Sequence, residues 1–212
     1  ATVDLSGKRV AYELQGRHLV WRPWVVLISG VGHDRSSWEP VLPVLRRFAR
    51  VVLIDNHGVG QSDPLRSHIT VEDLAADVIG VLDHAGIRRA HVVGVSLGGM
   101  IAQELAIEHP DRVRRLVLAS TTPGWTEGYP FPLSNALVLW RQILQPGPAG
   151  RRTGIRYALS PATRQGRPDL VERLSREDVL PSPDPRSRMF QAAAGTTYSN
   201  RGRDEMIAAP PV

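Results

Sequence analysis

The chain has 212 residues, of which 42% are hydrophobic and 22% are charged, and its formal net charge is +5. These values are typical of a globular protein with one large domain, with or without a small insertion. The absence of cysteine excludes disulfides, thiolate catalysis and cysteine-bound metal. No long apolar run occurs, and the first residues lack the layout of a signal peptide. We therefore expect a cytoplasmic protein with no membrane span.

The positive charge does not by itself indicate a nucleic-acid partner. Lys8 is the only lysine, so nearly all the basic residues are arginine, which suggests a coding bias. The arginines are scattered in pairs such as Arg46-Arg47 and Arg88-Arg89. Because neither a long basic run nor a nucleic-acid-binding motif occurs, we expect no nucleic acid among the partners.

Strand and helix patterns alternate over the first 120 residues. Residues 8–14 alternate as in a half-exposed strand. Short β-branched runs typical of strands buried on both faces of a parallel sheet follow at 25–29, 51–55, 91–95 and 116–120. Capping-box patterns predict helices that begin near Ser36 and Thr70, and a further helix is expected over 97–109. The alternation predicts an α/β fold with a mostly parallel, doubly wound sheet.

From about residue 121 the pattern changes. Glycine and proline cluster, no buried-strand run occurs between 121 and 205, and helix patterns follow at 133–144, 170–180 and 186–194. We expect a core over residues 1–120, a helical cap or lid over 121–205, and the start of a return to the core over 206–212.

The most informative motif is Gly-Val-Ser-Leu-Gly at residues 94–98. The pattern alone is weak evidence, but here it follows a buried strand and opens a helix, as a nucleophile elbow requires. Gly94 and Gly98 leave room for a sharp turn that presents the Ser96 hydroxyl at the carboxyl end of the strand. The helix N-terminus behind Ser96 favours developing negative charge. The alternative is that Ser96 is an ordinary helix N-cap, a role that needs no flanking glycines.

Two further loops follow buried strands in the same way. Residues 30–33 (GVGH) form a loop whose backbone can approach a substrate oxygen, and residues 56–62 (NHGVGQS) follow the next strand. A dinucleotide-binding site is not indicated. The first loop lacks the third glycine of that fingerprint, and no acidic residue follows at the required spacing.

In chain order, the segments ISGVG, DNHGVGQSD, VVGVSLGGMIAQELAIEHPDRV and RLVLAS resemble the α/β-hydrolase superfamily. The similarity is to its cap-bearing branch of esterases, lactonases and haloperoxidase-like enzymes. It covers residues 8–120 strongly and residues 121–205 only in architecture.

The resemblance implies that Ser96 is the nucleophile and that the backbone N–H groups of Val31 and Leu97 form the oxyanion hole. Ser29 stands where the family usually has a histidine, but the oxyanion donor is a backbone group and does not need that side chain. The serine in the elbow argues against the aspartate nucleophile of dehalogenases and epoxide hydrolases.

The acid and the base of the triad are harder to find. The superfamily places both after the nucleophile in the chain, yet the position after the LVLAS strand carries no carboxylate, and residues 207–212 resemble the approach to the strand that bears the acid. We therefore expect the last two strands, the acid and the histidine to lie beyond residue 212.

All seven histidines lie at or before residue 109. His33 and His57 are the only base candidates among them, and each has the alternative role of fixing its loop. Asp55 and Asp63 are interpreted as organising their turn rather than as a catalytic pair.

Together these patterns predict a hydrolase of small carboxylic esters or lactones that forms an acyl-enzyme on Ser96 and needs no cofactor or metal. The alternative is a non-catalytic binding or interaction protein of the same fold that lacks a complete triad. The LVLAS strand would form an apolar sheet edge with unpaired backbone groups, so we also expect the 212-residue chain to self-associate there.

Overall fold

The computed structural model describes residues 1–16, 21–125, 133–134, 137–138, 141, 155, 159–176 and 184–207. Within these ranges the strands form one sheet in the order β1-β2-β4-β3-β5-β6. Strands β3 to β6 are parallel to one another, and β2 joins β4 in the antiparallel direction, as β1 joins β2. The strands are β1 (Thr2–Asp4), β2 (Arg9–Gln15), β3 (Trp24–Ile28), β4 (Arg50–Asp55), β5 (Ala90–Val95) and β6 (Val113–Ala119).

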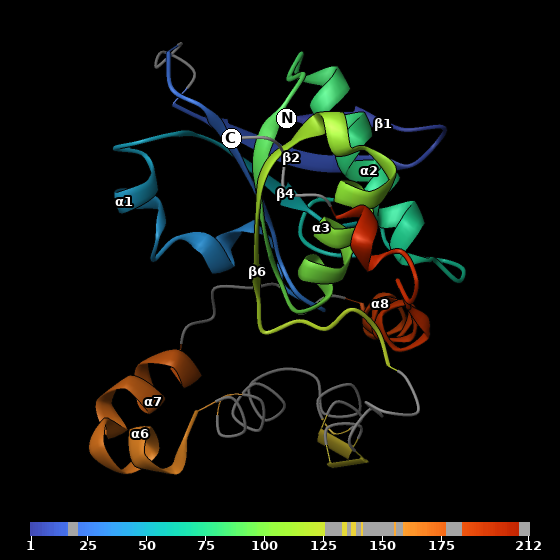
Figure 1. Cartoon of the computed structure of the whole chain (residues 1–212). Coiled ribbons are helices and arrows are strands. Elements are labelled where there is room, and N and C mark those ends of the chain that lie inside the picture. The colour runs from blue at the N-terminus through green and yellow to red at the C-terminus, as the bar shows by residue number, and fades with distance from the viewer. Residues whose placement is uncertain are drawn as a thin grey trace.

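Helices cover both faces of this sheet (Figure 1). The short helices η1 (Arg35–Trp38) and α1 (Leu42–Leu45) lie on one face, and α2 (Val71–His84) and α3 (Leu97–Glu108) pack together on the other. The later helices of the described residues are η2 (Pro110–Arg112), α6 (Pro161–Gly166), α7 (Pro168–Arg176), α8 (Pro185–Thr197) and η3 (Asp204–Met206). None of the described helices is long and apolar enough to cross a bilayer.

The buried strands supply side chains to two apolar layers. In β3, Val26 and Ile28 belong to the layer under α2 and α3, whereas Val25 and Leu27 belong to the layer under α1. Successive side chains of a strand point to opposite faces, so a strand covered on both faces must be apolar throughout. This arrangement confirms the predicted α/β fold with a mostly parallel sheet.

The two capping boxes have different outcomes. At α2, Asp73 N–H donates to Thr70 Oγ1 (3.1 Å) and Thr70 N–H donates to the Asp73 carboxylate (3.0 Å), which confirms the predicted helix start. The predicted box at Ser36 is wrong. Asp34 caps a 3₁₀ turn there and accepts the Ser36 N–H (2.8 Å), because its carboxylate stands two residues earlier and leaves Ser36 inside the turn.

Most other elements lie close to their expected positions. The predicted helix at 97–109 is α3. The strand expected at 116–120 begins earlier, at Val113, and it is largely exposed rather than buried on both faces, because it lies at the edge of the described sheet. Helix α7 overlaps the helix expected at 170–180, whose residues 177–180 lie outside the described residues, as does most of 133–144. The three-residue strand β1 was not expected, because so short a segment carries no periodic signal.

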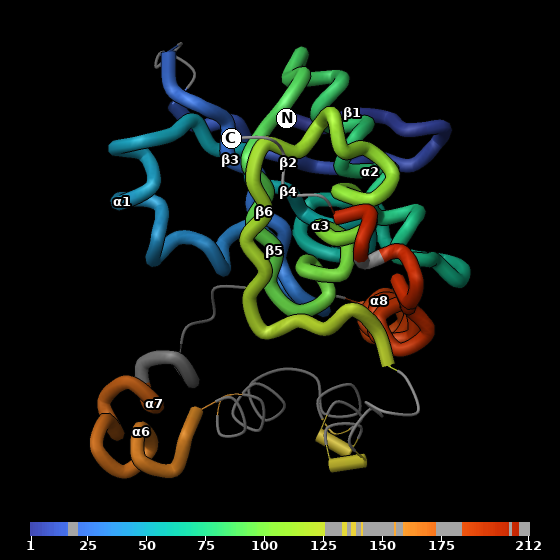
Figure 2. The backbone as a smooth tube through the Cα atoms, viewed as in Figure 1, coloured from blue at the N-terminus to red at the C-terminus, as the bar shows by residue number. Residues whose placement is uncertain are grey.

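The helices after β6 occupy two places. Helix α8 packs against α3, its Ala194 belongs to the main core, and a Cβ on Gly195 would lie 3.4 Å from Leu97 Cδ1. Helices α6 and α7 lie away from the sheet (Figure 2). Residues 121–205 therefore include at least one helix that is part of the core packing, and the boundary expected at residue 121 stays a prediction.

Candidate active site

Ser96 lies at the tip of a sharp turn between β5 and α3. Its backbone has φ 55° and ψ −122°, a conformation that is costly for a residue with a side chain. The turn is held because Ser96 N–H donates to the Ala119 carbonyl of β6 (3.0 Å) and Thr121 Oγ1 donates to the Ser96 carbonyl (2.8 Å). The side chain is exposed and makes no N-cap hydrogen bond, so the geometry favours a presented hydroxyl over a cap.

The two glycines of the motif allow this turn for steric reasons. A Cβ atom on Gly94 would overlap the Gly98 carbonyl, and one on Gly98 would overlap the Ile28 carbonyl at the end of β3. The first turn of α3 therefore packs directly against the backbone of two strands. This close approach aims the N-terminus of α3 at the carboxyl edge of the sheet.

The loop after β3 borders Ser96. A Cβ placed on Gly30 would lie 3.1 Å from Ser96 Cβ and 3.6 Å from Ser96 Oγ. Within the described residues, the N–H groups of Val31 and Leu97 donate to no protein acceptor. Two backbone donors beside an exposed hydroxyl can receive an oxygen that becomes negatively charged.

Ser29 fixes the base of this loop. It is 2% exposed, and its hydroxyl donates to the Asp34 carbonyl (3.1 Å). The Asn56 side chain donates to the Ser29 carbonyl (3.0 Å), which ties the loop after β3 to the loop after β4. The serine that replaces the histidine usual in the family is thus a fully bonded part of the loop.

Gln191 of α8 joins the same two loops from the other side. Its Oε1 accepts the Gly32 N–H (2.9 Å), and its Nε2 donates to the His57 carbonyl (2.8 Å). The side chain is fully buried. Sequence reasoning missed this residue, because one glutamine among small residues has the same pattern whether it faces solvent or a buried backbone group. We assign Gln191 as a positioning residue for the loop that carries Val31.

For the hydrolase that the sequence predicts, replacing Gln191 with leucine is expected to lower kcat about tenfold to 100-fold, because the loop donor shifts relative to Ser96. Stability should fall by about 1–3 kcal/mol, since the Gly32 N–H and the His57 carbonyl lose a buried partner. Thr196→Ala, at an exposed position of the same helix, is the control and should change neither quantity. An unchanged kcat in Gln191→Leu would show that α8 does not position the loop.

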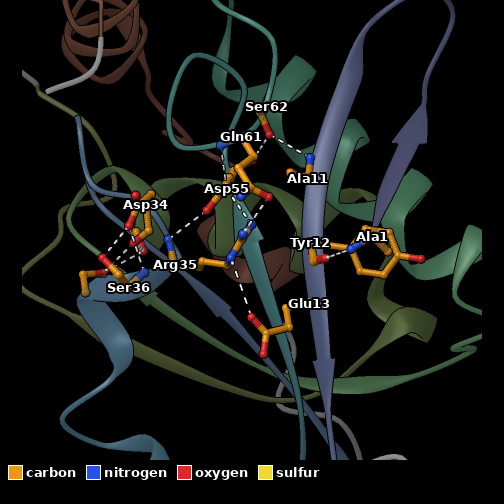
Figure 3. A network of polar contacts seen from close by, with 12 residues as sticks. Ala1, Ala11, Tyr12, Glu13, Asp34, Arg35, Ser36, Asp55, Gln61 and Ser62 are labelled. Atoms are coloured by element: carbon orange, nitrogen blue, oxygen red, sulfur yellow. Dashed lines mark hydrogen bonds and ion pairs between the residues drawn. The ribbon is translucent and has the colours of Figure 1, made fainter. Parts of the chain in front are cut away.

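Asp55, at the end of β4, organises the loop that follows it (Figure 3). Its carboxylate accepts the backbone N–H groups of Arg35 and Gln61 (2.9 Å each) and Arg35 Nη1 (2.6 Å). Burial raises the pKa of the Asp55 carboxyl, and these hydrogen bonds and the Arg35 charge oppose that rise. A Cβ on Gly60 would overlap the carboxylate, so the turn closes tightly around it.

Asp63 has a similar structural role, because its carboxylate accepts the Arg9 N–H (3.0 Å) and pairs with the Arg9 side chain (3.0 Å). With Asp55 it holds the turn between β4 and α2 in place, which agrees with the interpretation of both residues as turn organisers.

The two histidine candidates, His33 and His57, contact groups other than Ser96 in the described structure. His33 is exposed, and its Nδ1 lies 2.9 Å from the Val31 carbonyl of its own loop. His57 is buried, with Nδ1 3.7 Å from an Asp77 carboxylate oxygen of α2. No hydrogen bond joins either ring to Ser96 in the described structure. The geometry favours a loop-fixing role for His33 and a role in the core for His57.

Among the residues whose placement is described, no three or more histidine or acidic side chains are grouped so as to hold a metal ion.

Comparison with known proteins gives a consistent result. Residues 23–183 match the family described as "alpha/beta hydrolase fold". Over 120 residues the chain is 37% identical to the putative carbamate hydrolase RutD of Caulobacter vibrioides (strain NA1000 / CB15N), which covers 56% of this chain and 44% of that protein. The chain spans about half the length of the curated relatives it matches.

Solved structures are similar over nearly the whole chain. A hydrolase from Pseudomonas aeruginosa PA01 superposes with a TM-score of 0.77 at 26% identity, covering 99% of this chain and 85% of that one. Est816, an N-acyl homoserine lactone degrading enzyme, superposes with a TM-score of 0.71 at 27% identity, covering 92% and 71%. With the family match over most of its length, the chain belongs to the alpha/beta hydrolase fold family.

Proposed function

We propose that the protein is a serine hydrolase that cleaves small carboxylic esters or lactones with Ser96 as the nucleophile. The observation that carries the proposal is the exposed Ser96 hydroxyl on a strained turn, beside a loop whose Val31 N–H has no protein acceptor among the described residues. Strain of this kind persists only where the surrounding structure imposes it, and it concentrates at functional sites.

In the proposed reaction, Ser96 Oγ attacks the carbonyl carbon of the substrate and gives its proton to a general base. The carbonyl oxygen becomes negatively charged and accepts hydrogen bonds from the Val31 and Leu97 N–H groups, each contributing about 3 kcal/mol. The alcohol then leaves with a proton, and water hydrolyses the acyl group from Ser96. The base is not among the groups that hydrogen-bond Ser96 in the described residues.

The proposed substrate class can be compared with the substrates that the names of similar proteins state. One relative is named as a putative carbamate hydrolase, and one similar structure as an N-acyl homoserine lactone degrading enzyme. Carbamates, esters and lactones all place negative charge on a carbonyl oxygen in the transition state, so the site alone favours none strongly. We propose esters and lactones, whose carbonyl carbons are more electrophilic, because the nitrogen of a carbamate donates electron density to its carbonyl.

The test compares kcat/KM of the full-length natural protein on ethyl acetate, γ-butyrolactone and ethyl carbamate, so that the ester and the carbamate share one leaving group. We expect hydrolysis of the ester or the lactone to exceed that of the carbamate by about tenfold or more. Faster carbamate cleavage would overturn the substrate class. No hydrolysis of any of the three would favour the second candidate, a non-catalytic binding protein of this fold.

The 212-residue chain is further proposed to self-associate along β6. This strand pairs with β5 on one side and lies at the edge of the described sheet, with Val117 53% and Leu118 41% exposed. Exposed apolar edges pair readily with other chains. Sedimentation should show association that grows with concentration, and Leu118→Lys should shift the chain towards monomer. A wild-type chain that stays monomeric at all concentrations would contradict this proposal.

A further inference from the structure

A cavity of about 430 Å³ that opens widely to solvent lies at the amino ends of the parallel strands, whereas Ser96 follows the carboxyl end of β5. The amino ends of β3, β4, β5 and β6 all contribute to its wall. Its volume falls within the range of roughly 300–1,000 Å³ usual for small-molecule sites. The lining residues are Trp21, Arg22, Pro23, Trp24, Arg50, Arg89, His91 and Arg114.

The lining contains four arginines and no carboxylate. Among the described residues, no acidic side chain forms an ion pair with any of these four arginines. Burial lowers the pKa of His91, and the nearby charges of Arg114, Arg115 and Arg89 lower it further. The cavity therefore holds a concentration of positive charge that the described part of the protein does not neutralise.

Two of the guanidinium groups are held in place before any ligand arrives. Arg50 Nε donates to the Arg22 carbonyl (2.8 Å), and its guanidinium lies 4.5 Å from the centre of the Trp24 ring. Arg89 donates to the Val113 carbonyl through Nε (3.3 Å) and Nη2 (3.2 Å). Since the bond of Arg50 uses Nε alone, its two terminal nitrogens keep their hydrogen-bonding capacity. Preorganised donors lose little entropy on binding.

Arg22, which lines the cavity, also contributes a buried hydrogen-bond donor. Arg22 Nε is shielded from solvent and has no hydrogen-bond partner within the described structure. Such a donor costs free energy until it meets an acceptor. The aromatic part of the wall is equally available, because Trp21 is 75% exposed.

From this arrangement we infer that the cavity binds a small organic phosphate with an aromatic ring, of the size of a mononucleotide. Guanidinium groups match phosphate oxygens with paired hydrogen bonds, and several of them suit a di- or triphosphate better than a single carboxylate. The exposed Trp21 ring offers a stacking face for the base. The volume of the cavity suits one nucleotide, whereas a polynucleotide needs a longer basic groove that runs along the surface.

The test is calorimetric titration of the natural protein with ADP, adenosine, pyrophosphate and a single-stranded oligonucleotide. We expect ADP to bind more tightly than adenosine or pyrophosphate, because only ADP engages both the arginines and the Trp21 ring. Affinity for ADP should fall as salt is raised, as for any contact between guanidinium and phosphate. The readout does not depend on hydrolysis, so it stands apart from the function proposed for Ser96.

The double variant Arg50→Gln/Arg114→Gln should weaken ADP binding about tenfold or more, since two charge-assisted contacts are lost. The matched control is Arg66→Gln/Arg201→Gln, which removes the same charge from two exposed positions outside the cavity. Circular dichroism checks that both variants are folded. No ADP binding at millimolar concentration, equal weakening in the control, or tighter binding of the oligonucleotide than of ADP would each overturn the inference.

Discussion

Ser96→Ala is expected to lower kcat of the full-length protein on its best ester or lactone by about 10⁴-fold to 10⁶-fold. The loss is large because no covalent intermediate can form without the hydroxyl. The fold should survive, since Ser96 is exposed and its side chain makes no hydrogen bond to a described residue. Initial rates and the melting temperature are measured together.

The control is Ser67→Ala, an exposed serine in the loop before α2, which should keep full activity. A Ser96→Ala variant that keeps more than about a tenth of the wild-type kcat would show that the reaction does not pass through Ser96. Lost activity together with a lowered melting temperature would point to a folding role for Ser96 instead.

Arg203→Ala is expected to destabilise the protein by about 3 kcal/mol, at the low end for a broken buried ion pair because Arg203 itself reaches solvent. Its guanidinium donates to both oxygens of Glu104 on α3 (2.8 and 3.0 Å). The Glu104 side chain is only 1% exposed, so its charge would be left in the core with Tyr198 as its one remaining described donor (3.2 Å).

Burial and the negative charge of Glu104 raise the pKa of Tyr198, so this phenol stays protonated and keeps donating to the carboxylate. Urea unfolding should therefore show a lower midpoint for Arg203→Ala and an unchanged one for Arg201→Ala, an exposed arginine two residues away. Glu104→Gln should lower the free energy of unfolding by less than Arg203→Ala does, because water can hydrate the unpaired Arg203 guanidinium. A midpoint equal to the wild type in Arg203→Ala would mean that the pair does not anchor the chain after α8.

The sequence carried enough local information to predict the sheet and the elbow. The β-branched runs of β3 and β4 are buried on both faces, and a continuous apolar run is the direct consequence of that burial. The run of β5 is buried on one face and half-buried on the other. The elbow was visible because its glycines and its serine must stand within five residues of each other and between a strand and a helix.

Contacts between distant segments could not be predicted in this way. Gln191 bonds the backbone of residues 32 and 57, and Arg203 bonds a glutamate 99 positions earlier. Neither pattern leaves a periodic signal, because each partner alone resembles an ordinary surface residue.

The arginine-lined cavity shows the same limit most clearly. Arginines that are scattered along the chain come together there because the amino ends of parallel strands meet at one edge of the sheet. The basic residues are dispersed along the sequence, as interpreted, but at this edge of the sheet the fold brings four arginines together. The titration with an oligonucleotide tests whether this edge binds nucleic acid.

The central claim, that Ser96 is an activated nucleophile, is tested most directly by a fluorophosphonate probe followed by peptide mapping in the mass spectrometer. Such probes phosphonylate serine hydroxyls that a nearby base has activated. We expect the full-length natural protein to take up one probe molecule, on the peptide that contains Ser96, and the denatured protein to take up none. A folded protein that stays unlabelled, or that is labelled on another serine, would contradict the account.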